Sequence, residues 1–342
     1  MRSAERRARS GPTLRSALVL AARRLDDAHV SYGHGTTNAR DEAAWLALHA
    51  LGLPFEALDA GLDERLSPAE SARIAALVDE RIRTRKPAAY LTHEAWLGEH
   101  RFYVDERVIV PRSYIAELLR DGLSPWLAKP GEVRAALDLC TGSGCLAILL
   151  ALALKNARVD AADLSPDALA VAKRNVTDYG LARRVKLFRS DLYAALPARR
   201  YDVIVTNPPY VRDAVMRKLP AEYRREPALA LAGGADGLDL VRKIVGAAPA
   251  RLACGGLLVV EVGHNRARVE RAFPKLPLVW PETSGGNDCV FVITREALAR
   301  SASPARFRRA TPAGASPQPR AARSPARASG AAAVRRRRNA PA

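Results

Sequence analysis

Cysteine is scarce in this chain of 342 residues, which contains four. Cys140 and Cys145 flank a glycine-rich stretch, whereas Cys254 and Cys289 stand alone. This spacing matches no pattern of metal ligands, and the density is far below that of a disulfide-stabilised secreted domain. We therefore expect no metal in the functional site, no disulfide framework, and a reducing, cytoplasmic environment.

Long apolar runs are also missing. The stretch 17–22 is too short for the core of a signal peptide, and Arg23 and Arg24 follow it at once. No run reaches the roughly 18 residues that a membrane span requires. With 48% hydrophobic residues, the chain can still bury one ordinary core and a smaller one. We expect a soluble, unexported protein with no membrane partner.

Acidic residues are almost absent from the two ends of the chain. Residues 301–342 contain ten arginines and no acid, and residues 1–24 contain seven arginines and one glutamate. Because these ends carry +10 and +6 of the formal charge of +18, only about +2 remains between them. We expect a disordered basic extension over 1–12 and a disordered Arg/Pro/Ala-rich tail over 299–342. The tail is either a compositional bias or an arm that neutralises nucleic-acid phosphates.

The tetrapeptide Asn207-Pro208-Pro209-Tyr210, which follows the apolar run 201–206, points to a particular chemistry. At the end of a strand, the asparagine oxygen and the first proline carbonyl can accept both hydrogens of a planar NH2 group. The second proline fixes the turn, and the tyrosine offers a flat face for stacking. The alternative is a stiff turn with no catalytic part. We interpret these four residues as the catalytic residues of an enzyme that attacks through a delocalised nitrogen.

A glycine-rich loop upstream indicates a cofactor site. The predicted strand 135–139 runs into this loop, and the apolar helix 146–154 follows it. Such a loop lets backbone N–H groups approach a ligand where open α/β sheets bind cofactors. The spacing fits neither the dinucleotide fingerprint nor the P-loop, and an acid at its start favours a cationic ligand over a pyrophosphate. The residues concerned are Asp138, Cys140, Thr141, Gly142, Ser143 and Gly144.

Two further strand ends carry an acid. Asp163 ends the predicted strand that begins at Val159, and Asp191 follows the predicted strand that begins at Val185. An acid about 20 residues beyond a glycine loop is the usual partner of ribose hydroxyls. Each acid alone is also compatible with a helix N-cap. Three successive strand ends with an aspartate, followed by a fourth with Asn207, are harder to explain as caps.

Together these motifs resemble class I S-adenosylmethionine-dependent methyltransferases, and more closely the bacterial N5-glutamine methyltransferases of the HemK/PrmC and PrmB group. The similarity runs from about residue 13 to 298 and includes segments 32–36, 40–43, 89–92, 102–113, 219–227 and 285–291. The resemblance implies S-adenosyl-L-methionine as cofactor. Its expected contacts are Asp138, Cys140, Thr141, Gly142, Ser143, Gly144, Asp163, Asp191, Leu192 and Asn207.

Three segments, 32–36, 140–145 and 222–227, are similar to the PrmB branch, whose substrate is the third protein of the large ribosomal subunit, L3. The resemblance implies methyl transfer to the side-chain nitrogen (N5) of a glutamine in L3. The basic tail would then make non-specific contacts with ribosomal RNA.

Three alternatives stay open. A release factor glutamine methyltransferase shares the core motifs. An adenine N6 nucleic-acid methyltransferase uses the same kind of cradle on a flipped base, although a nearly neutral folded part lacks the basic face of a duplex binder. A non-catalytic ribosome-assembly factor with this fold would have little reason to keep Asp138, Asp163 and Asn207.

The pattern of helices and strands predicts the domain organisation. Residues 13–92 form a helical domain, with helices over 14–28, 40–51 and 67–85, the last with a capping box from Ser67 to Glu70. The resemblance implies that this domain binds the protein substrate. Residues 93–130 form a connecting helix and a hairpin that uses 96–105 and 108–110. Residues 131–298 form an α/β methyltransferase domain. We expect its sheet to be doubly wound and mainly parallel. The resemblance implies seven strands, with an antiparallel strand over 289–294 at the end.

Overall fold

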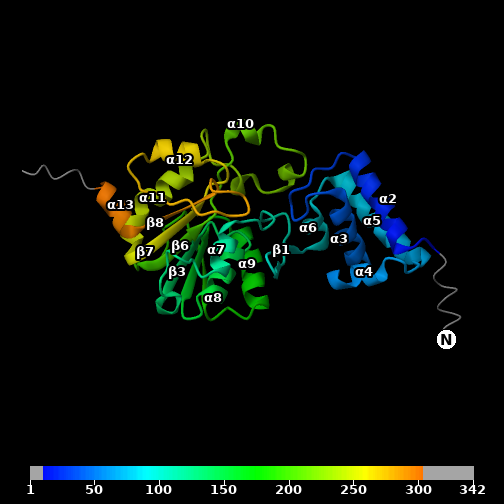
Figure 1. Cartoon of the computed structure of the whole chain (residues 1–342), viewed down its shortest axis with the longest axis horizontal. Coiled ribbons are helices and arrows are strands. Elements are labelled where there is room, and N and C mark those ends of the chain that lie inside the picture. The colour runs from blue at the N-terminus through cyan, green and yellow to red at the C-terminus, as the bar shows by residue number, and fades with distance from the viewer. Residues whose placement is uncertain (1–10, 303–342) are drawn as a thin grey trace, which may run out of the picture. The chain divides into compact units, whose positions relative to one another are not determined.

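The computed structural model describes residues 11–302 (Figure 1). The predicted extension 1–12 and tail 299–342 lie almost wholly outside this range. At the first border, the Gly11 N–H already donates to the Leu66 carbonyl, at 3.0 Å. At the last, helix α13 (Arg295–Ala302) continues past the predicted domain end at residue 298.

Helices make up the first part of the described chain. They are α2 (Leu14–Asp27), α3 (Ala39–Leu51), α4 (Leu58–Gly61), α5 (Pro68–Thr84) and α6 (Ala88–Thr92), with a short 3-10 turn at Phe55–Ala57. The capping box is present: Ser67 Oγ accepts from the Glu70 N–H at 3.2 Å, and the Glu70 carboxylate accepts from the Ser67 N–H at 2.7 Å. Buried Leu25, Leu46 and Val78 join α2, α3 and α5 into one core.

The predicted hairpin is shorter than expected. Strands β1 (Ala95–Leu97) and β2 (His100–Phe102) pair with each other, and Gly98 takes the left-handed conformation in the turn. The prediction that residues 108–110 form a strand is wrong, because this segment has no regular structure. The Val110 N–H donates instead to the Glu226 carboxylate, at 2.9 Å.

A six-stranded sheet forms the centre of the second part. Its strands are β3 (Ala135–Leu139), β4 (Arg158–Asp163), β5 (Val185–Arg189), β6 (Tyr201–Thr206), β7 (Leu252–Glu261) and β8 (Val290–Thr294). Their order is β5-β4-β3-β6-β7-β8, and only β8 runs antiparallel to its neighbour. The mainly parallel sheet with an antiparallel final strand is therefore confirmed.

Six regular strands lie in the described sheet where seven were expected. At the seventh position Val279 makes a single antiparallel bridge to Val292 of β8, with N–O distances of 3.0 and 2.8 Å. The next residues that would donate to β8 in the same register are Pro277 and Pro281. Because proline has no N–H, the ladder cannot extend in either direction.

Helices cover both faces of this sheet (Figure 1). One core contains α7 (Ile115–Arg120), α8 (Cys145–Ala153) and α9 (Pro166–Asp178), and the other contains α11 (Asp239–Arg251), α12 (Arg266–Ala272) and α13. Successive side chains of β6 point to opposite faces of the sheet: Val203 and Val205 pack in the first core, and Ile204 packs in the second. The short helix α10 (Asp213–Met216) and two 3-10 turns, Tyr223–Arg225 and Ala228–Ala230, follow β6. A last 3-10 turn, Pro130–Glu132, precedes β3.

The sheet topology fixes where a ligand site forms. From β3 the chain proceeds to β4 on one side, and β6 pairs with β3 on the other. Leu139 and Thr206 are paired at the carboxyl ends of these two strands, so the glycine loop and the Asn-Pro-Pro-Tyr turn begin side by side. This is the switch point at which open α/β sheets bind ligands.

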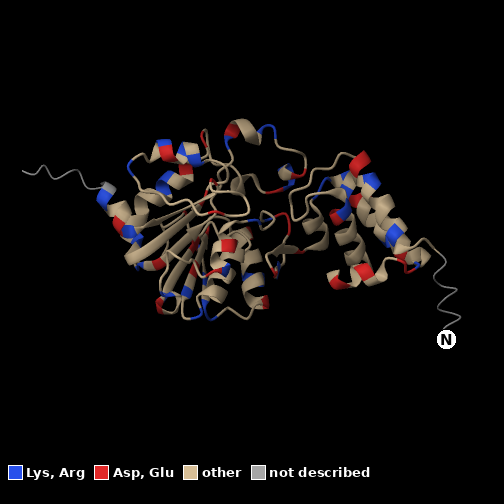
Figure 2. Cartoon of the chain, in the orientation of Figure 1, with Lys and Arg blue, Asp and Glu red and all other residues tan. Residues whose placement is uncertain are grey.

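Charged residues of both signs are interspersed along the helices and loops of the described chain (Figure 2). This agrees with the small net charge of the sequence between the two arginine-rich ends. Within residues 11–302 no helix is both long enough and apolar enough to cross a bilayer.

Candidate functional site

Two cavities meet at the carboxyl edge of the sheet. The larger, of about 340 Å³, lies at the ends of β3, β4 and β5. The smaller, of about 180 Å³, lies beyond β6. Ile109, Asn207 and Ala230 line both cavities. A group held in one cavity therefore faces the other across Asn207.

The predicted residues divide between these cavities. Cys140, Gly142, Asp163, Asp191, Leu192, Asn207 and Pro209 line the larger cavity. Asn207, Pro208 and Tyr210 line the smaller one. Asp138, Thr141, Ser143 and Gly144 line neither, although the sequence placed them in the same site.

These four residues instead hold the glycine loop in place through hydrogen bonds and packing. The buried Asp138 carboxylate accepts from the Thr141 hydroxyl at 2.5 Å, and burial raises the pKa of Asp138 to about 7. Asn175 of α9 donates to the Ser143 carbonyl at 2.8 Å. Gly144 has φ +81° at the start of α8, and a Cβ there would lie 3.1 Å from the Ala172 Cβ. Close packing of α8 on α9 therefore requires glycine at this position.

Asp163 fastens the glycine loop to the end of β4. One carboxylate oxygen accepts from the Gly142 N–H and the other from the Ser165 N–H, both at 2.9 Å. Burial raises the pKa of Asp163 against the opposing effect of these hydrogen bonds. The N-cap of α9 is Ser165, whose hydroxyl accepts from the Ala168 N–H, so Asp163 does not cap this helix.

Asp191 lies two residues beyond the end of β5, on an exposed turn at the rim of the larger cavity. The next residue, Leu192, has φ +48°, a left-handed conformation that non-glycine residues seldom adopt. Both side chains therefore depend on this turn for their position.

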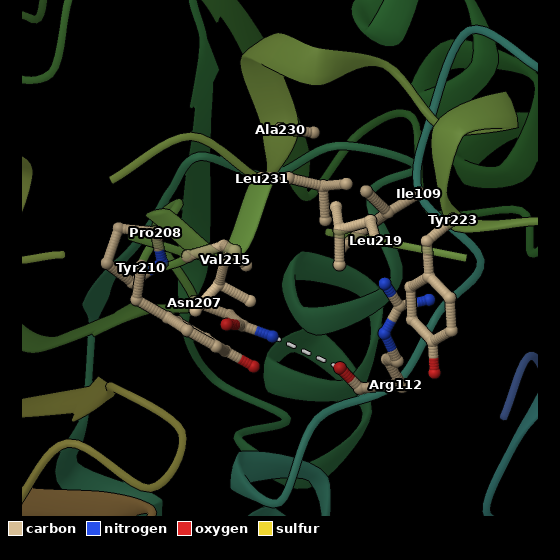
Figure 3. Close-up of a pocket in the computed structure, with 11 residues that line it drawn as sticks. Ile109, Arg112, Asn207, Pro208, Tyr210, Val215, Leu219, Tyr223, Ala230 and Leu231 are labelled. Carbon is tan, nitrogen blue, oxygen red and sulfur yellow. Dashed lines mark hydrogen bonds between the residues drawn. The ribbon is translucent and has the colours of Figure 1, made fainter. Parts of the chain in front are cut away.

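The Asn207 side chain is held by a backbone group from a distant segment. Its Nδ2 donates to the Arg112 carbonyl at 3.1 Å (Figure 3). This hydrogen bond identifies which end of the amide is nitrogen, and it makes Oδ1 the free acceptor end. The Tyr210 ring packs on Gly263, where a Cβ would lie 2.7 Å from the ring. Burial raises the pKa of Tyr210, so this phenol stays neutral.

The wall of the smaller cavity is mainly apolar. Val215, Leu219, Leu231 and the Tyr223 ring surround the space beside Asn207 (Figure 3). The charged Arg112 guanidinium also lies there, and it donates to both oxygens of Glu226 at 2.7 and 2.6 Å. This bidentate pair neutralises the charge, so the cavity suits an uncharged side chain.

Sequence reasoning missed several residues of the two cavities. Arg112 and Tyr223 line the smaller cavity, and Arg107, Leu229 and Lys243 line the larger one. Three of these five residues, Arg107, Arg112 and Tyr223, lie in segments 102–113 and 219–227, which resemble the glutamine methyltransferases. This resemblance was the signal that could have indicated them. It did not indicate which side chains turn toward a cavity, because both segments lack the regular period of a strand or long helix.

One group of three side chains with metal-binding atoms occurs in the described chain. The His264 Nδ1 lies 3.0 Å from an Asp288 oxygen, and the Cys289 Sγ lies 3.5 Å from the same nitrogen. None of the three residues lines either cavity. That no metal takes part in the reaction stays a prediction.

Comparisons with known proteins identify the family. The PrmC N-terminal domain matches residues 16–92, and the methyltransferase small domain matches residues 122–222. Among solved structures, the hMettl16 catalytic domain is similar at 16% identity and a TM-score of 0.45, over 66% of this chain and 80% of that one.

Curated relatives are much more similar. The ribosomal protein uL3 glutamine methyltransferase of Bordetella pertussis is 58% identical over 84% of this chain and 96% of its own length. Its counterpart in Burkholderia pseudomallei is 56% identical, over 82% and 94%. That of Neisseria meningitidis serogroup B is 52% identical, over 84% and 94%. With this identity over nearly their whole length, the chain belongs to the family of ribosomal protein uL3 glutamine methyltransferases.

Proposed function

We propose that this protein transfers a methyl group from S-adenosylmethionine to the N5 nitrogen of a glutamine side chain in ribosomal protein uL3 (L3). The relatives named for this activity support the substrate. The observation that carries the chemistry is the hydrogen bond from Asn207 to the Arg112 carbonyl, because it turns the Asn207 oxygen into a fixed acceptor for a substrate NH2 group.

The larger cavity fits the cofactor. Its volume falls within the range of small-molecule sites, about 300 to 1,000 Å³. The Asp163 and Asp191 carboxylates suit ribose hydroxyls and the positive charge of the ligand, and the glycine loop at Gly142 allows close approach. When bound there, S-adenosylmethionine supplies an electrophilic methyl group on a sulfonium.

The catalytic task of the protein is to make an amide nitrogen react. The lone pair of this nitrogen is shared with its carbonyl, so it is a poor nucleophile. The Asn207 oxygen and the Pro208 carbonyl accept the two hydrogens of the substrate NH2 and fix its orientation, and Tyr210 packs beside it. Orientation of this kind is worth about 7 to 11 kcal/mol in favourable intramolecular reactions. After alkylation the nitrogen carries a strongly acidic proton, which the two acceptors hydrogen-bond and which is finally lost to water.

The smaller cavity supports a neutral substrate side chain. Its apolar wall excludes water from the amide, and the Arg112 charge is already paired with Glu226. A glutamine side chain fits this environment better than a charged side chain, whose burial would be uncompensated.

An assay with competing substrates tests the proposal. The protein is incubated with labelled S-adenosylmethionine and, side by side, uL3, a release factor and DNA. We expect label on uL3. Label on the release factor would assign the chain to the other glutamine methyltransferase branch, and label on DNA would indicate an adenine N6 methyltransferase.

The arginine-rich end of the sequence adds an electrostatic contact to this proposal. We infer that the arginines of residues 303–342 contact ribosomal RNA without reading its sequence, since arginine neutralises phosphates irrespective of the base. A cytoplasmic location follows from a substrate that is a ribosomal protein. The division into residues 13–92 for substrate binding and 131–298 for methyl transfer belongs to the same proposal.

A further inference from the structure

The partner of Asn207 lies on a segment without regular structure. Residues 110–114, named the strap here, connect the β1–β2 region to α7 and have no helix or strand assignment before α7 begins. Their Arg112 carbonyl accepts the Asn207 Nδ2 hydrogen bond at 3.1 Å. Since no ladder of backbone hydrogen bonds holds the strap, its position depends on side chains around it.

Glu226 anchors one end of the strap. Its carboxylate accepts from the Val110 N–H at 2.9 Å and from both terminal nitrogens of Arg112 at 2.7 and 2.6 Å. The Glu226 side chain has no exposed surface. The ring of His34, from the N-terminal helical part, lies 3.6 Å from the same carboxylate and 4.2 Å from the Tyr223 ring.

Glu261 anchors the other end. It is the last residue of β7, and it accepts from the Ser113 hydroxyl at 2.5 Å and from the Tyr114 N–H at 2.9 Å. Glu261 is also buried, with 2% of its surface exposed. Because Thr206 of β6 is paired with Val260 of β7, Glu261 and Asn207 leave neighbouring strands at the same edge of the sheet.

We propose that Glu226 and Glu261 are positioning residues for Asn207, acting through the strap. This inference rests on the proposed role of Asn207 as acceptor of the substrate NH2. Burying a carboxylate is unfavourable unless hydrogen bonds compensate it. Here Val110 and Arg112 donate to Glu226, and Ser113 and Tyr114 donate to Glu261. The two carboxylates fix the strap from opposite ends, and the Arg112 carbonyl between them fixes the Asn207 amide.

The consequence for the reaction is geometric. If one anchor is lost, the strap can shift, and the Asn207 oxygen moves with the carbonyl that holds its nitrogen. A displacement of about 1 Å at a reacting group can lower the rate by about 100-fold. Neither carboxylate lines the larger cavity, so cofactor binding does not depend on them directly.

The test uses the full chain with Glu226→Gln and Glu261→Gln. The matched control is Glu222→Gln, on the same loop as Glu226 and also buried, because the hydrogen bonds of Glu222 go to Arg81 and Arg85 rather than to the strap. We expect kcat on uL3 to fall about 10- to 100-fold in both strap variants, with S-adenosylmethionine affinity within about threefold of the parent. The control should keep kcat within about threefold.

A double-mutant cycle separates positioning from general stability. Arg112→Gln and Glu226→Gln act on one ion pair, so the double variant should lose no more kcat than the more damaging single variant. Independent, multiplying losses would overturn the inference, as would an unchanged kcat in both strap variants. If Glu261→Gln does not fold, the variants of Arg112 and Glu226 still decide. A variant that binds cofactor has kept its fold.

A second readout does not depend on substrate. The side-chain amide NMR signals of Asn207, identified by their loss in Asn207→Asp, should shift in both strap variants and not in Glu222→Gln. Unmoved signals in both strap variants would contradict the inference. If the signals shift while the parent protein fails to label uL3, the proposed function is wrong and the positioning contact stands.

Discussion

At the scale of single residues, the proposed chemistry depends most on Asn207. It lies where the two cavities meet, and its amide nitrogen is already bonded to the Arg112 carbonyl. The remaining acceptor end is therefore available to a substrate without reorganisation. Asp163 differs from Asn207, because its carboxylate accepts hydrogen bonds from the backbone N–H groups of Gly142 and Ser165 at the larger cavity.

We predict that Asn207→Ala lowers kcat by about 100-fold or more, because the substrate NH2 loses an orienting acceptor. Cofactor affinity should stay within a few-fold, since the anchoring carboxylates are untouched. Single-turnover kinetics measure the first quantity and calorimetry the second. A variant that keeps most of its activity would exclude this role for Asn207.

Asp163→Ala should weaken S-adenosylmethionine binding by about tenfold or more, since losing a charge-assisted hydrogen bond costs about 1.5 to 3 kcal/mol. The loop at Gly142 also loses its tie to β4, which adds to the effect. Calorimetry with the wild type and the variant checks this. Unchanged affinity would reduce Asp163 to a purely structural residue of the loop.

At the scale of elements, strands and their ends could be predicted from the sequence, and the connections between them could not. Short apolar runs predict β3, β4, β6 and β8, and Asp163 and Asn207 mark where β4 and β6 end. The strap has no such run. A backbone carbonyl such as that of Arg112 has no sequence signature at all, so its bond to Asn207 required the fold.

The same reasoning explains the two differences in the sheet and hairpin. Residues 108–110 are three β-branched apolar residues, a composition typical of a strand, but the Val110 N–H donates to the buried Glu226 carboxylate instead of to a neighbouring strand. The seventh strand is reduced to one bridge because Pro277 and Pro281 interrupt its hydrogen bonds. In both cases a tertiary partner or a missing donor overrides the local pattern.

The strap anchors should have opposite effects on stability as the pH changes. Burial raises the pKa of Glu261 to about 7 from an ordinary value of 4.5, so the folded state keeps a proton that the unfolded chain has lost. Stability from this group falls as the pH rises between these values. For Glu226, the hydrogen bonds from Arg112 and the nearby His34 ring outweigh the effect of burial and lower its pKa to about 2. Its contribution is present above pH 4.5 and is lost as the pH falls toward 2.

We therefore predict that Glu261→Gln flattens the decline of thermal stability between about pH 4.5 and 7. Scanning calorimetry across this range, on the wild type and the variant, measures the two slopes. Identical slopes would show that Glu261 does not titrate differently on folding. Burial also raises the pKa of Asp138 to about 7. Asp138 therefore accounts for any decline of thermal stability that remains in Glu261→Gln.

At the scale of the whole molecule, the proposed catalysis and the proposed attraction to RNA belong to different parts of the sequence. Both cavities lie within the described residues, where the net charge is small. The arginine-rich tail lies outside them. A deletion should begin at residue 303, because Ala297 and Leu298 of α13 are buried in the core of the sheet.

Removing residues 303–342 should leave methylation of free uL3 unchanged, because the deletion spares both cavities. It should weaken association with ribosomal particles at low salt, and added salt should erase the difference. Sedimentation with particles across a salt series tests this. Unaltered particle binding would leave the arginines as compositional bias, and lost activity on free uL3 would show that the tail contributes to the catalytic part.

We propose that this chain methylates a glutamine amide of uL3 through Asn207. The most direct measurement is tandem mass spectrometry of uL3 after reaction with S-adenosylmethionine and either the wild-type protein or Asn207→Ala. We predict one added methyl group on the side-chain nitrogen of a single glutamine with the wild type, and about 1% of that product or less with the variant in the same time. A methyl group on another residue type, or equal modification by Asn207→Ala, would contradict the account.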